Sequence, residues 1–208
     1  MLPQSASSIR SPVTPERIIP FFRQLLRSLH ALHSIGVWHE DLKPANILMT
    51  DTGMPVLADF GLTTFSPKMR KAVSGGGTLD YMSPEKIEVG RPIRVGRTGF
   101  GADTLCVVCQ NRPYDGAAAD VYACGILLYK WLRNHHPFIR DRGNDTDEVI
   151  EDRIIKGECD FKMTREPGSA GELIWKMIRG DPVRRWTVSR ENDSILLEAF
   201  ANVGLVRI

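Results

Sequence analysis

The stretch from Ala117 to Leu132 is apolar nearly all round. A helix of this kind cannot lie on a protein surface, because a surface helix keeps a polar face toward water. Its apolar run is also shorter than the ~20 residues that a membrane-spanning helix needs, and Lys130 interrupts it. We therefore expect a buried central helix, with the other elements of a globular protein packed around it.

A second helical pattern begins at Thr14 and ends at Gly36. Its apolar residues recur every three or four positions, which places them on one helix face: Ile18, Phe22, Leu25, Leu29 and Leu32. Thr14 and Pro15 suit the N-cap and the first helical position. Because Pro20 would remove a backbone hydrogen bond inside the helix, the regular helix begins either at Pro15 or only near Pro20.

Two short apolar segments, 47–49 and 56–58, flank a turn-rich link and predict a hairpin. The ranges 147–155 and 170–178 predict two further amphipathic helices. The expected fold class is therefore mainly α with short β-hairpins.

Two segments lack these patterns. Residues 1–13 are polar and predict a disordered leader, whereas 14–208 reads as one domain. Residues 87–116 are rich in glycine and arginine and predict an insertion or long loop.

Charge and composition exclude several classes of protein. The 27 basic residues nearly balance the 25 acidic ones, for a net charge of +2. Generic nucleic-acid binders and polybasic membrane binders concentrate positive charge, so neither partner is expected. The first fourteen residues lack the apolar core of a secretory signal. We expect an intracellular, cytoplasmic protein.

The four cysteines are too few for a disulfide framework. Cys106 and Cys109 have the spacing of half a zinc site, but no second C-x-x-C follows them. A structural zinc ion needs four ligands. Ordinary cysteines are therefore favoured over a zinc protein, and metal analysis of the purified chain would decide between the two.

The most informative segment is 37–49, Val-Trp-His-Glu-Asp-Leu-Lys-Pro-Ala-Asn-Ile-Leu-Met, followed by Asp-Phe-Gly at 59–61. Asp41 and Asn46 stand in the relation D-x-x-x-x-N, and the D-F-G triplet lies a short distance downstream. This combination resembles the catalytic loop and the magnesium-binding loop of a protein kinase. A lone D-F-G would be weak evidence, but the ordered set is specific.

The resemblance implies a role for each of four residues. Asp41 would accept or orient the proton of the substrate hydroxyl. Lys43 would stabilise charge on the transferred phosphoryl group of ATP. Asn46 and Asp59 would supply oxygen ligands for Mg²⁺. The alternative, that these side chains only cap turns, is credible for each residue alone but not for the set.

Three later segments also resemble the family: 77–85, Gly-Thr-Leu-Asp-Tyr-Met-Ser-Pro-Glu; 120–125, Asp-Val-Tyr-Ala-Cys-Gly; and 181–187, Asp-Pro-Val-Arg-Arg-Trp-Thr. They are similar to the end of the activation segment, the start of the central helix and a late D-P-x-x-R segment. The resemblance implies that Asp120 hydrogen-bonds the catalytic loop and that Glu85 pairs with Arg185. Lys43 and Thr78 together resemble serine/threonine kinases rather than tyrosine kinases.

The chain also departs from the family pattern. Ahead of Thr14 there is no G-x-G-x-x-G loop and no lysine in a V-A-I-K context. The resemblance, over residues 14 to 187, therefore implies the large lobe (C-lobe) alone, with the small N-terminal lobe missing. Glu40 replaces the arginine of H-R-D. Because an anion would repel a phosphate, we expect phosphorylation of Ser74 not to be the activating event.

Two hypotheses of different class follow. The first is the catalytic region of a serine/threonine kinase, truncated to its large lobe, which transfers the γ-phosphoryl group of ATP to a protein substrate. The second is an inactive, kinase-derived module that binds partners. In either case the surface on which a small lobe would dock is expected to be apolar and to attract a protein partner.

Overall fold

Helix α3 (Gly116–Arg133) runs through the middle of the computed structural model, as the sequence predicts. The structure describes residues 4–9, 13–66, 71–72, 76–94, 107–109, 113–186 and 188. Asp115 caps α3 by accepting a hydrogen bond from the Ala118 amide at 3.1 Å, and Asn134 ends it in the left-handed conformation, φ 56°. Nearly every residue of α3 is buried, so the other elements pack around it.

Helix α1 (Pro15–Ser34) lies beside α3 and turns its predicted apolar face toward it. Thr14 is its N-cap, and Pro20 lies inside the helix with its ring exposed. The alternative start near Pro20 is therefore wrong. The ring of Trp131 in α3 meets Phe21 and Phe22 edge-on, at centroid distances of 5.8 and 6.4 Å.

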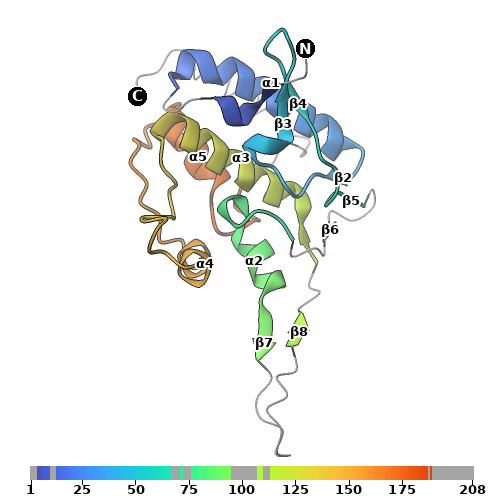
Figure 1. Ribbon diagram of the computed structural model, residues 1–208, viewed down its shortest axis with the longest axis vertical. Helices are drawn as coiled ribbons and strands as arrows, with labels where there is room; N and C mark the ends of the chain where they lie inside the picture. The colour runs from blue at the N-terminus through green and yellow to red at the C-terminus, as the bar shows by residue number, and fades with distance from the viewer. Residues whose placement is uncertain are drawn as a thin grey trace, which may run out of the picture.

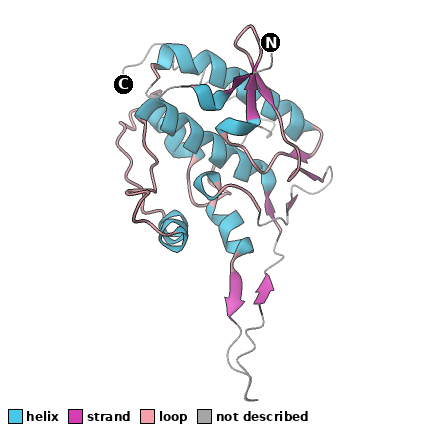
Figure 2. Cartoon of the chain, viewed as in Figure 1, coloured by secondary structure: helices cyan, strands magenta, loops and turns pink. Residues whose placement is uncertain are grey.

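Three shorter helices complete the helical part (Figure 2): α2 (Pro84–Gly90), α4 (Asp147–Lys156) and α5 (Ala170–Met177). Helix α5 packs so closely on α3 that a Cβ atom at Gly125 would lie 2.6 Å from a methyl carbon of Ile178. Helix α4 packs on α2, where Arg91 pairs with Glu151 and Asp152 at 2.9 and 2.7 Å. Helices α4 and α5 confirm the two amphipathic patterns.

The predicted hairpin is formed by β3 (Ile47–Met49) and β4 (Pro55–Leu57), which pair antiparallel. A third strand, β1 (Gln4–Ser5), pairs with β3. The 3₁₀ helix η1 (Ala6–Ser8) follows it, with Ala6 fully buried. Ser5 also donates a hydrogen bond to the Pro44 carbonyl at 2.8 Å. Residues 4–9 are thus folded, which corrects the expectation of a disordered leader for that part of 1–13.

The other strands form three short antiparallel pairs: β2 (Val37–Trp38) with β5 (Thr64–Phe65), β6 (Lys71–Ala72) with β9 (Tyr114–Asp115), and β7 (Pro92–Arg94) with β8 (Val107–Cys109). Strands β7 and β8 stand away from the body of the molecule (Figure 1). The range 87–116 is therefore not a loop throughout, because its first residues belong to α2. Cys106 lies outside the described residues.

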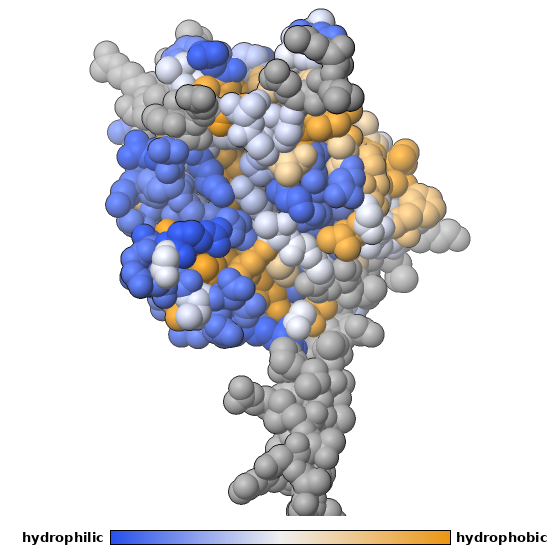
Figure 3. Space-filling view, in the orientation of Figure 1, coloured by the Kyte–Doolittle hydropathy of each residue, from blue (hydrophilic) through white to orange (hydrophobic). Residues whose placement is uncertain are grey.

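Apolar side chains also gather on one outer face. Figure 3 shows this surface on the side that carries β2, β4 and β5. Several exposed large apolar residues belong to the chain segment that runs through β4 to β5, namely Met54, Val56, Phe60, Leu62 and Phe65, and Ile35 after α1 is also exposed. Within the described part of the chain, no helix combines the length and apolar character needed to cross a membrane.

Candidate active site

The segment from His39 to Asn46 connects β2 to β3 and is attached by hydrogen bonds to α3. Asp120 accepts hydrogen bonds from the backbone amides of His39 and Glu40, both at 2.8 Å, and lies 2.9 Å from His33 Nε2. Burial alone would raise the pKa of Asp120, but these hydrogen bonds outweigh it and hold the pKa below its usual value. Asp120 therefore fixes this loop as the sequence predicts.

Glu40 adopts the left-handed backbone conformation, φ 65°, which is uncommon for a residue with a long side chain. Such strain persists only where the surroundings impose it. The hydrogen bonds that the amides of His39 and Glu40 donate to Asp120 help to hold the turn. The turn brings Asp41 to the surface of the loop, directly after a buried segment.

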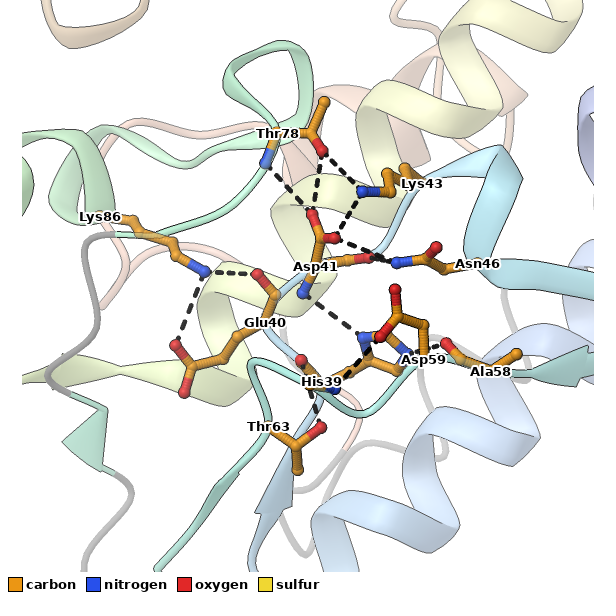
Figure 4. A network of polar contacts seen from close by, with 11 residues as sticks. His39, Glu40, Asp41, Lys43, Asn46, Ala58, Asp59, Thr63, Thr78 and Lys86 are labelled. Atoms are coloured by element: carbon orange, nitrogen blue, oxygen red, sulfur yellow. Dashed lines mark hydrogen bonds and ion pairs between the residues drawn. The ribbon is translucent and has the colours of Figure 1, made fainter.

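Lys43, Asn46 and Thr78 all donate hydrogen bonds to the carboxylate of Asp41 (Figure 4). One carboxylate oxygen accepts hydrogen bonds from Lys43 Nζ at 2.6 Å and from the Asn46 amide at 3.1 Å. The other accepts both from the backbone N–H of Thr78 at 3.1 Å and from its hydroxyl at 3.0 Å. Lys43 also donates to the Thr78 hydroxyl at 3.1 Å. The structure thus brings Asp41, Lys43 and Asn46 together.

The contacts of Asp41 set its charge. Burial would raise its pKa, but the hydrogen bonds from Lys43 and Thr78 dominate and lower it below the usual value for aspartate. Asp41 is therefore ionised throughout the neutral range. An ionised carboxylate at this position can orient a hydroxyl group and accept its proton.

Asp59 is held next to the loop through its neighbours. The Ala58 amide donates to the Asn46 carbonyl at 2.9 Å, and the Ala58 carbonyl lies 3.0 Å from His39 Nε2. The Phe60 ring packs against His39 at 5.2 Å between centroids. Asp59 itself has φ 61° and an exposed side chain, one oxygen of which accepts a hydrogen bond from Gly61 at 3.3 Å.

The side-chain oxygen atoms of Asn46 and Asp59 are the kind of ligand that a hard cation prefers. The amide nitrogen of Asn46 is used by Asp41, which leaves its amide oxygen turned away from that bond. Together with the exposed carboxylate of Asp59, it offers the oxygen ligands that Mg²⁺ prefers, while substrate phosphates and water would complete the coordination. In the described ranges, no group of three His, Cys, Asp or Glu side chains could hold a metal ion.

The predicted pair between Glu85 and Arg185 is confirmed. Arg185 donates to both oxygens of Glu85, at 2.6 and 2.9 Å, and its side chain is fully buried. It also donates to the carbonyls of Ala118 and Gly180, at 2.9 and 3.1 Å. The start of α2 is thus tied to the chain that follows α5.

Several residues at the site carried no clear signal in the sequence. The place of Thr78 after Gly77 does not reveal its hydrogen bonds to Asp41. Lys86 and Tyr114 contact Glu40 from two distant segments, and nothing in the spacing of either residue reveals this. Ser74 lies outside the described residues.

Comparison with known proteins identifies the family. The model of the protein kinase domain matches residues 4–195. CBL-interacting protein kinase 24 of Oryza sativa subsp. japonica is 31% identical over 171 residues, which are 82% of this chain and 32% of that protein. CBL-interacting serine/threonine-protein kinase 3 of Arabidopsis thaliana is 34% identical over 170 residues, 80% of this chain and 32% of that protein.

A fungal relative, serine/threonine-protein kinase GIN4 of Saccharomyces cerevisiae, is 29% identical over 180 residues, 85% of this chain and 13% of that protein. The chain belongs to the protein kinase family, and its similar proteins are serine/threonine kinases. It spans about a third, or less, of the length of these relatives.

Proposed function

We propose that this protein is a serine/threonine protein kinase that transfers the γ-phosphoryl group of ATP to a hydroxyl of a protein substrate. The observation that carries the proposal is the cluster at Asp41, in which an ionised carboxylate, a lysine and an amide meet on one partly buried loop. Phosphoryl transfer requires this kind of site, because its catalysis depends on positioning the reacting groups and neutralising their charge.

The proposed mechanism gives each side chain one task. Asp41 orients the acceptor hydroxyl and takes its proton, and Lys43, at 2.6 Å from Asp41, stabilises charge on the transferred group. Asn46 and Asp59 would hold Mg²⁺, which would supply neutralising charge to the phosphates. Thr78 keeps Asp41 in place through two hydrogen bonds.

We further propose that the chain acts in the cytoplasm and is the large-lobe part of the catalytic domain. The exposed apolar residues Phe60, Leu62 and Phe65 support the lobe assignment, because a covering small lobe would remove them from water. A protein partner at the same face is the alternative. The proposed small lobe would cover the nucleotide and anchor its phosphates.

ATP binding tests the lobe assignment. We expect the isolated chain to bind ATP and Mg²⁺ weakly and to phosphorylate little, because one wall of the nucleotide site is open to water and charges there are screened. Calorimetry measures this. Micromolar binding by the isolated chain would contradict it. A two-lobed form, with a kinase small lobe supplied ahead of Met1, should bind ATP and transfer phosphate; if it does neither, the inactive binding module is the better description.

A cavity of about 230 Å³ beside the catalytic loop supports a protein substrate. Pro44 of the loop, Tyr81 of the activation segment and Lys130 of α3 contribute to its lining. Lys130 and Arg142 both pair with the single carboxylate of Asp80. Burial lowers the pKa of the adjacent His136 to about 4, so this imidazole is neutral at pH 7. Lys130 is the charged residue of the cavity lining, and a positive charge there favours an acidic side chain of the substrate.

Exchanging the charge of Lys130 tests this substrate preference. Peptides with an aspartate near the acceptor serine should be phosphorylated better than matched lysine peptides, and Lys130→Glu should reverse the order. The expected change in kcat/KM is several-fold, the scale of a partly exposed ion pair worth up to about 1 kcal/mol. Lys156→Glu on α4 is the control and should leave the preference as it is. An unchanged preference in Lys130→Glu would exclude this cavity as the selecting site.

A further inference from the structure

Lys86 is a lysine in an unusual position, because it is only 2% exposed. It lies in α2, next to Glu85, yet the two side chains serve different partners. Glu85 pairs with Arg185, whereas the ammonium group of Lys86 donates a hydrogen bond to the Glu40 carbonyl and lies 3.6 Å from the Glu40 carboxylate. A buried ammonium is costly unless it is paired in this way.

Glu40 is equally enclosed. Its side chain is fully buried, and its carboxylate also accepts a hydrogen bond from the Tyr114 hydroxyl at 2.5 Å. Its backbone amide donates to Asp120 at 2.8 Å. Glu40, which replaces the arginine of H-R-D, is thus joined to α2, to β9 and to α3, directly before Asp41.

The two charges depend on one another. Burial lowers the pKa of Lys86, and the negative charge of Glu40 opposes this effect. Removing either charge leaves the other buried without its counter-ion, which is unfavourable. This pair therefore stabilises one arrangement of the loop, in which the left-handed turn at Glu40 is held from both sides.

The pair also reaches the activation segment. Gly77 has φ 137°, and a Cβ atom there would lie 3.4 Å from the Glu40 carbonyl oxygen and 3.5 Å from Lys86 Nζ. The next residue, Thr78, makes the two hydrogen bonds to Asp41. The Lys86 ammonium, the Glu40 carbonyl and Gly77 therefore meet at the point where the activation segment approaches the catalytic loop.

We propose that Lys86 is a positioning residue for Asp41, which sets the catalytic loop and the end of the activation segment from inside the protein and makes an activating phosphate on that segment unnecessary. This inference rests on the proposed kinase function. The positive charge that contacts Glu40 in the described part of the chain is supplied by α2 and is already matched by Glu40. The positive charge of Lys86 is therefore not available to pair with a phosphate on the activation segment.

The test compares Lys86→Met, which keeps most of the length of the side chain and removes its charge, with Glu40→Gln, which keeps the shape and removes the anion. Ile154→Ala is the control for stability, because Ile154 is buried in α4, an apolar residue outside the hydrogen bonds and ion pair that join Lys86, Glu40 and Asp41. Hydrogen exchange of the whole chain is measured first. In both charge variants the amides of Glu40 and Thr78 should exchange about tenfold faster, whereas those of α1 and α5 should not, because local opening is selective.

Turnover is then measured in the two-lobed form after phosphatase treatment. We expect Lys86→Met to lower kcat by about 10²-fold with little change in KM for ATP, because a small misplacement of a reacting group has that effect. Phosphatase treatment should not change the kcat of the wild type, and the Ser74→Ala variant should have the same kcat as the wild type. Ile154→Ala should lower the melting temperature and keep kcat.

The outcomes separate the two proposals. If the charge variants exchange no faster at Glu40 and Thr78 than Ile154→Ala does, Lys86 has a structural role only and the inference is overturned. If phosphatase treatment abolishes the activity of the wild type, the phosphate is needed and the inference is again overturned. If the exchange is selective but no two-lobed form transfers phosphate, Lys86 positions the loop and it is the kinase function that fails.

Discussion

Replacing Asp41 by asparagine is expected to lower kcat by about 10²–10⁴-fold, the usual contribution of a general base. The asparagine keeps the shape of the side chain, but its single amide oxygen can accept hydrogen bonds either from Lys43 or from Thr78, which donate to different oxygens of Asp41. Because Asp41 is only half-buried and lies outside the apolar core, the fold should be preserved. What it loses is the negative charge, which the lowered pKa of Asp41 maintains in the neutral range. Peptide phosphorylation by the two-lobed form is the measurement.

Asp51→Asn is the matched control. Asp51 lies exposed in the turn between β3 and β4, so the same chemical change there should leave kcat unaltered. Circular dichroism and melting curves of both variants show whether each remains folded. Near-normal turnover in Asp41→Asn would show that another group takes the proton, and the role of Asp41 would then have to be given up.

The helical frame was predictable because its signals are local. A run that is apolar all round, as in α3, has no stable place except the interior. The hairpin of β3 and β4 follows equally from two short apolar segments around a turn. The meeting of Asp41 with Lys43 and Asn46 was predictable for the same reason, since all three lie within one short loop.

Contacts between distant segments were harder to predict. Glu85 and Arg185 were paired only through resemblance to a family, since 100 positions separate them. The bonds from Lys86 and Tyr114 to Glu40 span 46 and 74 positions, and no periodicity reports them. Gln4 and Ser5 form a short edge strand, which is held by backbone hydrogen bonds rather than by apolar side chains. Because both residues are polar, the sequence predicts a leader there instead of a strand.

Removing the Arg185 side chain is expected to cost the largest amount of stability. Arg185→Ala leaves Glu85 without its two hydrogen bonds and also removes donors from the carbonyls of Ala118 and Gly180. Breaking a buried ion pair by removing one partner costs about 3–5 kcal/mol. For a chain of this size the melting temperature should fall by roughly 10 °C. Thermal unfolding followed by circular dichroism measures the shift.

The neighbouring arginine provides the control. The side chain of Arg184 is 78% exposed and its contact with Asp181 is 3.4 Å long, so Arg184→Ala should leave the melting curve nearly unchanged. If the two alanine variants had the same melting temperature, the ion pair of Arg185 would not be stabilising the attachment of α2 to the rest of the fold.

The double variant Glu85→Ala with Arg185→Ala separates the ion pair from the other bonds of Arg185. Because it leaves no buried charge unpaired, its loss of stability should be smaller than the sum of the losses in the two single variants. Additive losses would mean instead that Arg185 acts mainly through its bonds to the backbone carbonyls.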